Sequence, residues 1–170
     1  FWLVDAAGAL AARDEVVVEE AIARSVVFKA DVVAADKSES KGVRECLNYG
    51  HTLGHAVESL AGYGTFSHGA AVAEGMRFAA RMAVSLVDAP LDLVEAQDRL
   101  LDELGLPALD WSADPAAMLE AMKRDKKARH GQVRFVLPQD VGAWQLADVD
   151  DGIILEHLAA WQRSKEQSHE

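Results

Sequence analysis

Apolar residues recur three or four positions apart along most of the chain, which is the spacing of one face of an α-helix. Local signals mark several helix ends. Asp114-Pro115 is a cap followed by proline at the first helical position, and Gly105 and Pro107 follow a predicted last turn. The pattern predicts helices over about Leu10–Ala35, Val43–Leu60, Gly69–Val87, Leu91–Leu104, Pro115–Arg124 and Asp151–Gln162.

The period changes near the end of the chain. Gln132–Leu137 alternates apolar and polar residues, and Ala143–Leu146 follows after a turn signal at Gly142. These two segments predict a short β-hairpin, whereas the polar stretch Asp36–Gly42 predicts a loop. The expected fold class is therefore mainly α, a single helical domain over residues 1–170 with a small β-hairpin near its end.

Composition narrows the class of protein. The chain has 170 residues, 50% of them hydrophobic and 26% charged, which is ordinary for a globular domain and excludes a disordered, collagen-like or disulfide-stapled protein. The net charge of −11 argues against nucleic acid and anionic membrane surfaces as partners. No apolar run is long enough for a transmembrane helix. The single cysteine, Cys46, predicts a packed thiol and a reducing, cytoplasmic setting.

Candidate chemistry is concentrated in one helical segment. Arg44, Asn48, His51 and His55 step by four, three and four residues, which predicts one stripe on a helix face. Four different polar groups on one face favour ligand binding, while the alternative is a surface helix with incidental histidines. Gly50 and Gly54 lie in this segment, and each lowers helix stability by about 1 kcal/mol relative to alanine. That cost is reasonable where another backbone or a ligand must come close.

The histidines suggest a metal site. His51 and His55 could bind one ion from one helix face, and a glycine-rich loop can bring His68 back toward them. Two histidines and a carboxylate suit a catalytic divalent metal with open positions. Glu58 and Glu74 are the nearby acidic candidates, although a solvated helix surface is the more common place for such glutamates.

Cationic side chains lie on both sides of the histidines in the sequence. Lys29 is a lone lysine in an apolar helical stretch, so it either snorkels to solvent or meets an anion. Lys126 and Lys127 belong to a basic segment just before the hairpin. That segment is either a solvated turn or a site for phosphate or carboxylate.

Leu47–Glu58 resembles the signature of the 3-dehydroquinate synthase family. The resemblance extends from about Ile22 to Gly142 and includes further segments in the family's order, namely Phe28–Asp36, Ser67–Met76, Leu104–Pro107 and Asp125–Leu137. It implies the helical C-terminal domain of a two-domain, dehydroquinate-synthase-like fold. It also implies an N-terminal NAD-binding domain of the same enzyme as a partner, and a possible homodimer.

The resemblance implies an activity as well. The family is a cyclising carbon–oxygen lyase that converts a seven-carbon keto-acid phosphate, DAHP, to 3-dehydroquinate and phosphate in the shikimate pathway of chorismate and aromatic amino acid biosynthesis. It uses NAD and a divalent metal, usually zinc, with cobalt possible. By resemblance His51 and His68 are metal ligands, and the catalytic and substrate-binding set is His55, Asn48, Arg44 and Lys29, with Lys126 or Lys127 at the phosphate.

The chain also departs from the family pattern. A third metal ligand, a glutamate, and a substrate lysine are expected in a helix just before Phe1, as is the NAD-binding domain. The apolar start Phe1–Val4 is then the cut edge of a longer chain, and these residues alone are expected to be inactive and to bind zinc weakly. The loop Lys37–Lys41 is about one residue longer than usual, with Lys37 where an acid is common, which affects the aim of Lys29 relative to Arg44.

Three other functions stay open. A related cyclase of the 2-deoxy-scyllo-inosose synthase type acts on substrates without a carboxylate, and Arg44 with Asn48 argues against it. A metal-dependent alcohol dehydrogenase shares the two-domain plan, but the cationic residues disfavour a small neutral alcohol. A non-catalytic helical binding module that retains the old site is the third.

Overall fold

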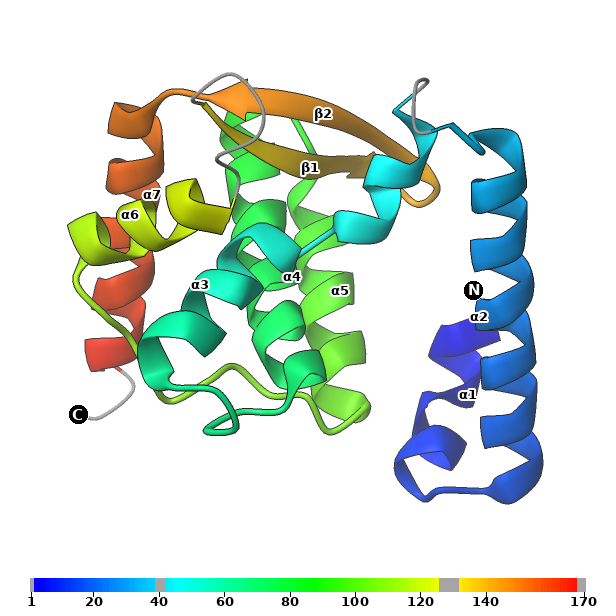
Figure 1. The fold of residues 1–170 in the computed structure, drawn as a ribbon. Coiled ribbons are helices and arrows are strands. Elements are labelled where there is room, and N and C mark those ends of the chain that lie inside the picture. Colours follow the sequence, from blue (N-terminus) through cyan, green and yellow to red (C-terminus); the bar gives the residue numbers. More distant parts are fainter. Residues whose placement is uncertain (1, 39–41, 126–131, 168–170) are drawn as a thin grey trace.

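The computed structural model describes residues 2–38, 42–125 and 132–167, and it is mainly helical with one hairpin near the C-terminus, as the sequence predicts (Figure 1). In chain order the elements are α1 (Trp2–Ala11), α2 (Glu15–Ala35), the 3₁₀ helix η1 (Val43–Asn48), α3 (His51–Ala61), α4 (His68–Leu86), α5 (Leu91–Glu103), α6 (Pro115–Asp125), β1 (Val133–Asp140), β2 (Ala143–Val149) and α7 (Asp151–Gln167). Within the described residues, no helix is both long enough and apolar enough to cross a membrane.

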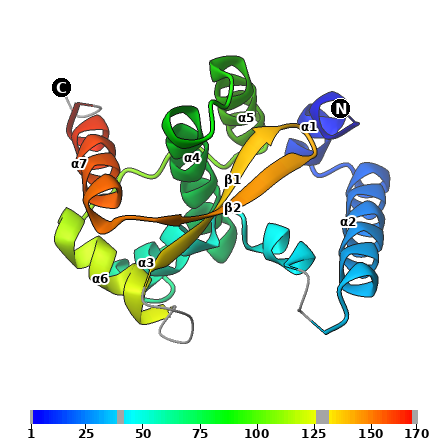
Figure 2. The ribbon, with the colours of Figure 1, turned by 90° about the horizontal axis from the view of Figure 1, so that it is seen from above.

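The hairpin covers the central helices. β1 and β2 pair antiparallel, with Val133 opposite Val149, and Gly142 takes the left-handed conformation of the turn at φ 81°. Val133, Phe135 and Leu137 alternate toward the interior and are buried. Figures 1 and 2 show the hairpin lying over α3 and α4. The alternation read from the sequence therefore places one face of β1 on the helical core.

The core lies between α3, α4, α6, α7 and β1. Its fully buried large side chains come from all five elements and include Leu53, Met82, Met118, Leu137 and Leu158. Burial of such side chains contributes roughly 1.5–3 kcal/mol each. This core fixes α3 and α4 relative to each other, and the histidines are on these two helices.

The predicted helix Val43–Leu60 is wrong as one continuous element. The chain forms η1, turns at Tyr49 and Gly50, and then starts α3. Gly50 has φ 80°, a conformation that costs other residues strain. A Cβ on Gly50 would lie only 2.5 Å from the carbonyl oxygen of Val72. Gly50 is therefore required both for the turn and for the close approach of α4.

The N-terminal residues form an arm beside this body. Trp2–Ala11 is the helix α1, which the sequence did not predict, and α2 begins only at Glu15, where the Asp14 side chain accepts from the amides of Val16 and Val17. Figures 1 and 2 show α1 and α2 standing apart from α3 and α4. Several apolar side chains of α2, including Ile22, are exposed.

Glu74 is a structural acid. Its side chain is only 2% exposed, it accepts from the Trp161 indole at 2.6 Å and the Leu109 amide at 2.8 Å, and it pairs with Lys165 at 2.5 Å. The expectation of a solvated glutamate or a metal candidate is wrong for Glu74, because the carboxylate is turned toward α7 and the chain before α6. The Glu74 carboxylate thereby links α4 to α7.

We expect Glu74→Gln to lower the free energy of unfolding by about 3 kcal/mol. The variant leaves the ammonium of Lys165 buried without a counter-charge, and removal of one partner of a buried ion pair typically costs about 3–5 kcal/mol. Urea unfolding followed by circular dichroism measures the change. Glu103→Gln, on the exposed end of α5, is the matched control and should change stability by less than about 0.5 kcal/mol. Equal stability of the two variants would show that the buried pair is not a stabilising contact.

Candidate metal centre

Three imidazoles meet where α3 and α4 begin. His51 and His68 are the first residues of α3 and α4, and His55 is one turn into α3. The ring centroids are 5.4 Å apart for His51 and His55, 5.3 Å for His51 and His68, and 5.9 Å for His55 and His68. One nitrogen of each ring lies within 4.8 Å of the other two, close enough for a single metal ion. The predicted return of His68 toward the other histidines is confirmed.

Local backbone features place these rings. The left-handed turn at Gly50 directly precedes His51, and the Ser67 hydroxyl caps α4 by accepting from the Ala70 amide at 3.2 Å. The two helices then cross at glycines. A Cβ on Gly75 would lie 1.8 Å from the carbonyl oxygen of Gly50. With this contact the first turn of α3 lies directly against the backbone of α4.

Two of the imidazoles are oriented by acceptors. Nδ1 of His51 lies 3.2 Å from the Tyr49 carbonyl, and Nδ1 of His68 lies 3.1 Å from Oε2 of Glu58. The Tyr49 hydroxyl is itself anchored 2.5 Å from the Gln97 amide oxygen. When the Nδ1 atoms donate to these acceptors, each ring keeps the lone pair on Nε2 for a ligand.

The electrostatics favour neutral imidazole at His51. Burial lowers the pKa of His51 most, the Tyr49 carbonyl opposes that change, and the neighbouring His55 and His68 lower it further. A neutral imidazole is the form that binds a metal. Three imidazole nitrogens suit zinc, copper, iron or nickel, whereas calcium and magnesium prefer oxygen ligands. The donor set therefore fits a transition-metal ion such as zinc or cobalt.

The predicted polar stripe is wrong as a feature of one helix. Arg44 and Asn48 belong to η1, and the turn at Gly50 separates them from the helix that carries His51 and His55. The side chain of Asn48 is exposed and donates to Glu45 at 3.1 Å. In the chain, η1 nevertheless ends only three residues before His51.

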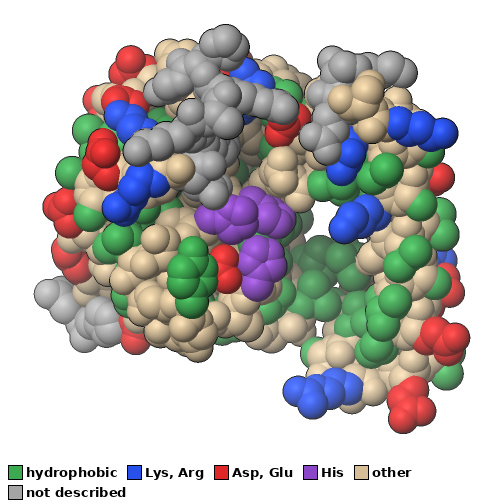
Figure 3. All heavy atoms as spheres, viewed as in Figure 1, with side chains coloured by type: hydrophobic (Ala, Val, Ile, Leu, Met, Phe, Trp, Pro, Cys, Tyr) green, Lys and Arg blue, Asp and Glu red, His purple; other side chains and the backbone are tan. Residues whose placement is uncertain are grey.

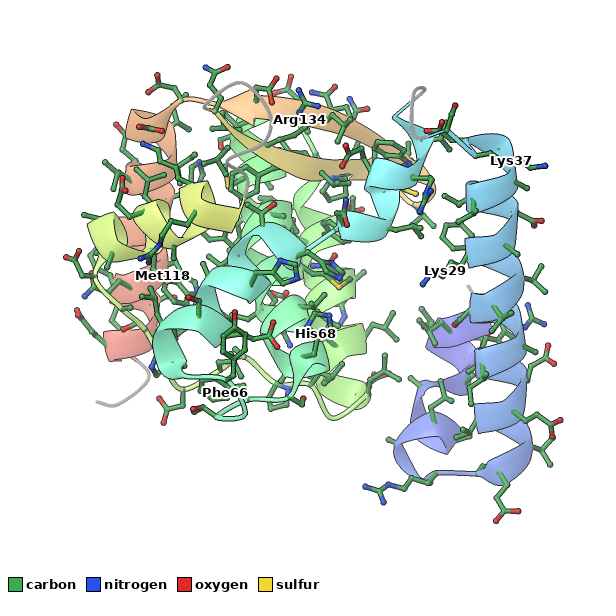
Figure 4. All side chains as sticks on the ribbon, in the orientation of Figure 1. Lys29, Lys37, Phe66, His68, Met118 and Arg134 are labelled. Atoms are coloured by element: carbon green, nitrogen blue, oxygen red, sulfur yellow. The ribbon has the colours of Figure 1, made fainter. Side chains whose placement is uncertain are left out.

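The predicted lysines come from other elements. Lys29 projects from α2 toward the body of the molecule, on the side that carries His68 (Figure 4). Figure 3 shows the histidine side chains gathered in one surface patch, with a hollow between this patch and the α2 arm and basic side chains on the opposite wall. Lys126 and Lys127 lie outside the described residues.

Glu58 was predicted only as a possible ligand or a solvated glutamate, and its contact with His68 was missed. Its side chain is 16% exposed, and the contact joins α3 to α4. The signal was present in the sequence, because His51, His55 and Glu58 are spaced by four and three residues on one helix. The return of α4 that brings His68 to this face could not be positioned from spacing.

Comparisons with known proteins give one family. Residues 1–128 match the family model described as 3-dehydroquinate synthase C-terminal. A 3-dehydroquinate synthase of Rhodopirellula baltica is 45% identical over 141 residues, 83% of this chain and 38% of that protein. Another, from Xylella fastidiosa strain M12, is 44% identical over 165 residues, 93% of this chain and 44% of that protein. The chain thus spans about two fifths of the length of these curated relatives.

Solved structures are similar as well. A 2-epi-5-epi-valiolone synthase from Streptomyces hygroscopicus subsp. jinggangensis 5008, with NAD⁺ and Zn²⁺ bound, superposes with a TM-score of 0.78 over 95% of this chain and 46% of its own, at 21% identity. That likeness concerns the fold. A 2-deoxy-scyllo-inosose synthase, complexed with carbaglucose-6-phosphate, NAD⁺ and Co²⁺, gives a TM-score of 0.63 at 30% identity over 76% of this chain and 37% of its own.

We expect Gly75→Ala to disrupt the crossing of α3 and α4. The added methyl group would meet the Gly50 carbonyl oxygen, and because both sides of the contact are backbone, the helices must move apart. Over-packing typically costs about 1–3 kcal/mol in the free energy of unfolding, and we expect this backbone clash to reach the upper end of that range, which urea unfolding measures.

The matched control is Gly69→Ala, in the same helix and next to His68. A Cβ at Gly69 would meet nothing within 4 Å. We expect its stability to be unchanged or higher by up to about 1 kcal/mol. Similar losses at the two positions would contradict a specific role for the helix crossing.

Proposed function

The chain belongs to the 3-dehydroquinate synthase family, and on that premise we propose that it is the metal- and substrate-binding part of an enzyme that converts DAHP to 3-dehydroquinate and phosphate. The observation that carries the proposal is the meeting of His51, His55 and His68 at the starts of two helices. NAD⁺ is the proposed hydride acceptor of the reaction. The nucleotide is bound by the N-terminal domain of the same enzyme.

We assign the metal to His51 and His68, with a carboxylate from outside these residues as a third ligand. Zinc is the proposed ion, and cobalt is compatible with the same nitrogen donors. A divalent metal bound there supplies a Lewis acid that polarises a substrate hydroxyl and lowers its pKa. The contacts of Tyr49 and Glu58 with the two rings support the assignment, because such acceptors commonly orient metal-binding histidines.

The remaining side chains position the substrate. The guanidinium of Arg44 and the ammonium of Lys29 are proposed to hold the substrate carboxylate, and the amide of Asn48 is proposed to lie near the substrate and its phosphate. The imidazole of His55 lies next to both metal-binding rings, so it can hold a proton beside the reacting hydroxyl or the phosphate. Lys126 or Lys127 is proposed to meet the phosphate. Fixing both anionic ends of one flexible substrate lowers the entropic cost of reaction.

A second candidate is a cyclase of the 2-deoxy-scyllo-inosose synthase type. One solved relative with 30% identity has that activity in its name and is complexed with a glucose 6-phosphate analogue. Curated relatives named 3-dehydroquinate synthase have 44–45% identity over most of this chain. A guanidinium at Arg44 matches a carboxylate, which glucose 6-phosphate lacks.

Substrate comparison tests the proposal. We expect the full-length protein that contains this chain, supplied with NAD⁺ and Zn²⁺, to release phosphate from DAHP and not from glucose 6-phosphate. The 170 residues alone should release none from either. Preference for glucose 6-phosphate would support the related cyclase. Turnover of neither substrate would support a non-catalytic binding module. Turnover by the 170 residues alone would show that the reaction needs no separate nucleotide-binding domain.

Loss of a metal ligand tests the site. In the full-length protein, we expect His51→Ala and His68→Ala each to lower both zinc content and kcat/KM for DAHP by more than about 100-fold, beyond the usual effect of residues that only orient ligands. Metal analysis of the dialysed protein and a coupled phosphate assay give the two readouts. His157→Gln is the control, since His157 contacts Ser85 on the far side of α4. Full zinc content in both alanine variants would refute the assignment.

A further inference from the structure

The contact between Glu58 and His68 joins two helices across the metal-site histidines. Glu58 lies seven positions after His51 on α3, and its carboxylate accepts from Nδ1 of the first residue of α4 at 3.1 Å. The Glu58 side chain is 16% exposed, while that of His68 is 57% exposed. The more exposed ring of His68 thus contacts a more buried carboxylate, which lies on a helix whose other face is buried in the core.

The chemistry of imidazole gives this contact a consequence. A neutral ring carries one proton, and the hydrogen bond made by one nitrogen decides which nitrogen keeps the lone pair. In water the neutral ring favours the proton on Nε2, which would leave the wrong nitrogen for the metal. A carboxylate can only accept, so Glu58 requires the proton on Nδ1 and leaves Nε2 of His68 as the donor atom.

We propose that Glu58 is a positioning residue for the metal centre. It holds His68 in the Nδ1–H tautomer and aims Nε2 toward His51. The inference rests on the proposed function for the metal itself, but the tautomer is a property of the protein without metal. His51 is held in the same way by the Tyr49 carbonyl. That acceptor belongs to the backbone, so no substitution of Glu58 removes it, and His51 serves as an internal reference for the tautomer.

The tautomers can be observed directly. Long-range ¹H–¹⁵N spectra of the metal-free protein near pH 8, above the ordinary histidine pKa of about 6.5, distinguish a protonated from an unprotonated ring nitrogen. We expect the unsubstituted protein to show Nδ1–H at both His51 and His68. Glu58→Met keeps the length of the side chain and removes the acceptor, so it should move His68 toward Nε2–H and leave His51 unchanged. Glu58→Gln keeps an acceptor oxygen and should retain Nδ1–H at His68.

Metal affinity gives the second readout. Competition with a chelator should show that Glu58→Met weakens Zn²⁺ binding by about 10–100-fold, the usual effect of a lost partner of a ligating histidine. Glu58→Gln should fall between this variant and the unsubstituted protein, because its bond to the ring is uncharged. Glu95→Gln, which removes one charge from the exposed surface of α5, is the control and should leave both readouts unchanged.

The outcomes separate this inference from the proposed function. Nε2–H at His68 in the unsubstituted protein, or an unchanged tautomer in Glu58→Met, would overturn the role of Glu58 even if zinc binds. If instead the tautomers behave as expected and the full-length protein binds no zinc, the metal assignment fails while the orientation by Glu58 stands. If the Glu58→Met variant also loses the His51 signal, the Glu58→Ala variant is measured in its place. Retention of Nδ1–H at His68 in the Glu58→Ala variant would contradict the proposal.

Discussion

The carbonyl oxygen of Gly50 lies where a side chain on Gly75 would have to be, and the arrangement of the metal-site histidines depends on this contact. Without it, the starts of α3 and α4 could not approach closely enough to bring His51 and His68 within reach of one ion. The large buried side chains around the crossing hold the two helices together from the other side. The histidine cluster thus lies against the hydrophobic core, and close packing of that kind is what holds side chains to the narrow tolerance that metal coordination needs.

Polar groups serve two separate purposes on the two sides of α4. At the back, Glu74 is enclosed with Lys165 and Trp161, where its charge is balanced and its oxygens are bonded. At the front, His51 and His55 are half-buried and His68 is exposed, and one nitrogen of each ring lies within 4.8 Å of the other two. The buried acid of α4 is thus paired away from the histidines, whereas the acid that contacts His68 comes from α3.

Much of the fold follows from local patterns, and the exceptions have physical causes. Helical spacing and the alternation before Gly142 are enough for α4, α5, α6, α7 and the hairpin, because each buries a face that its own sequence marks. The break at Gly50 is not predictable in this way, since the turn is imposed by the backbone of α4 passing close to it. The burial of Glu74 could not be predicted from its own segment, because its partner Lys165 lies ninety-one positions later in the chain. The pairing of His51 with His55 was predictable from their spacing and the return of His68 from the glycine-rich loop before it, whereas the contact of His68 with Glu58 and the orientation of the rings depend on how two helices meet.

The contact of Gly50 with Gly75 also bears on how such a site can change over evolutionary time. When two side chains touch, a larger residue on one side can be offset by a smaller one on the other. Here one partner is a carbonyl group and the other is a missing side chain, so no second substitution can make room for the first. The two positions should therefore stay glycine without varying in concert, and methods that detect contacts from correlated substitutions would overlook the approach of the two helices on which the site depends.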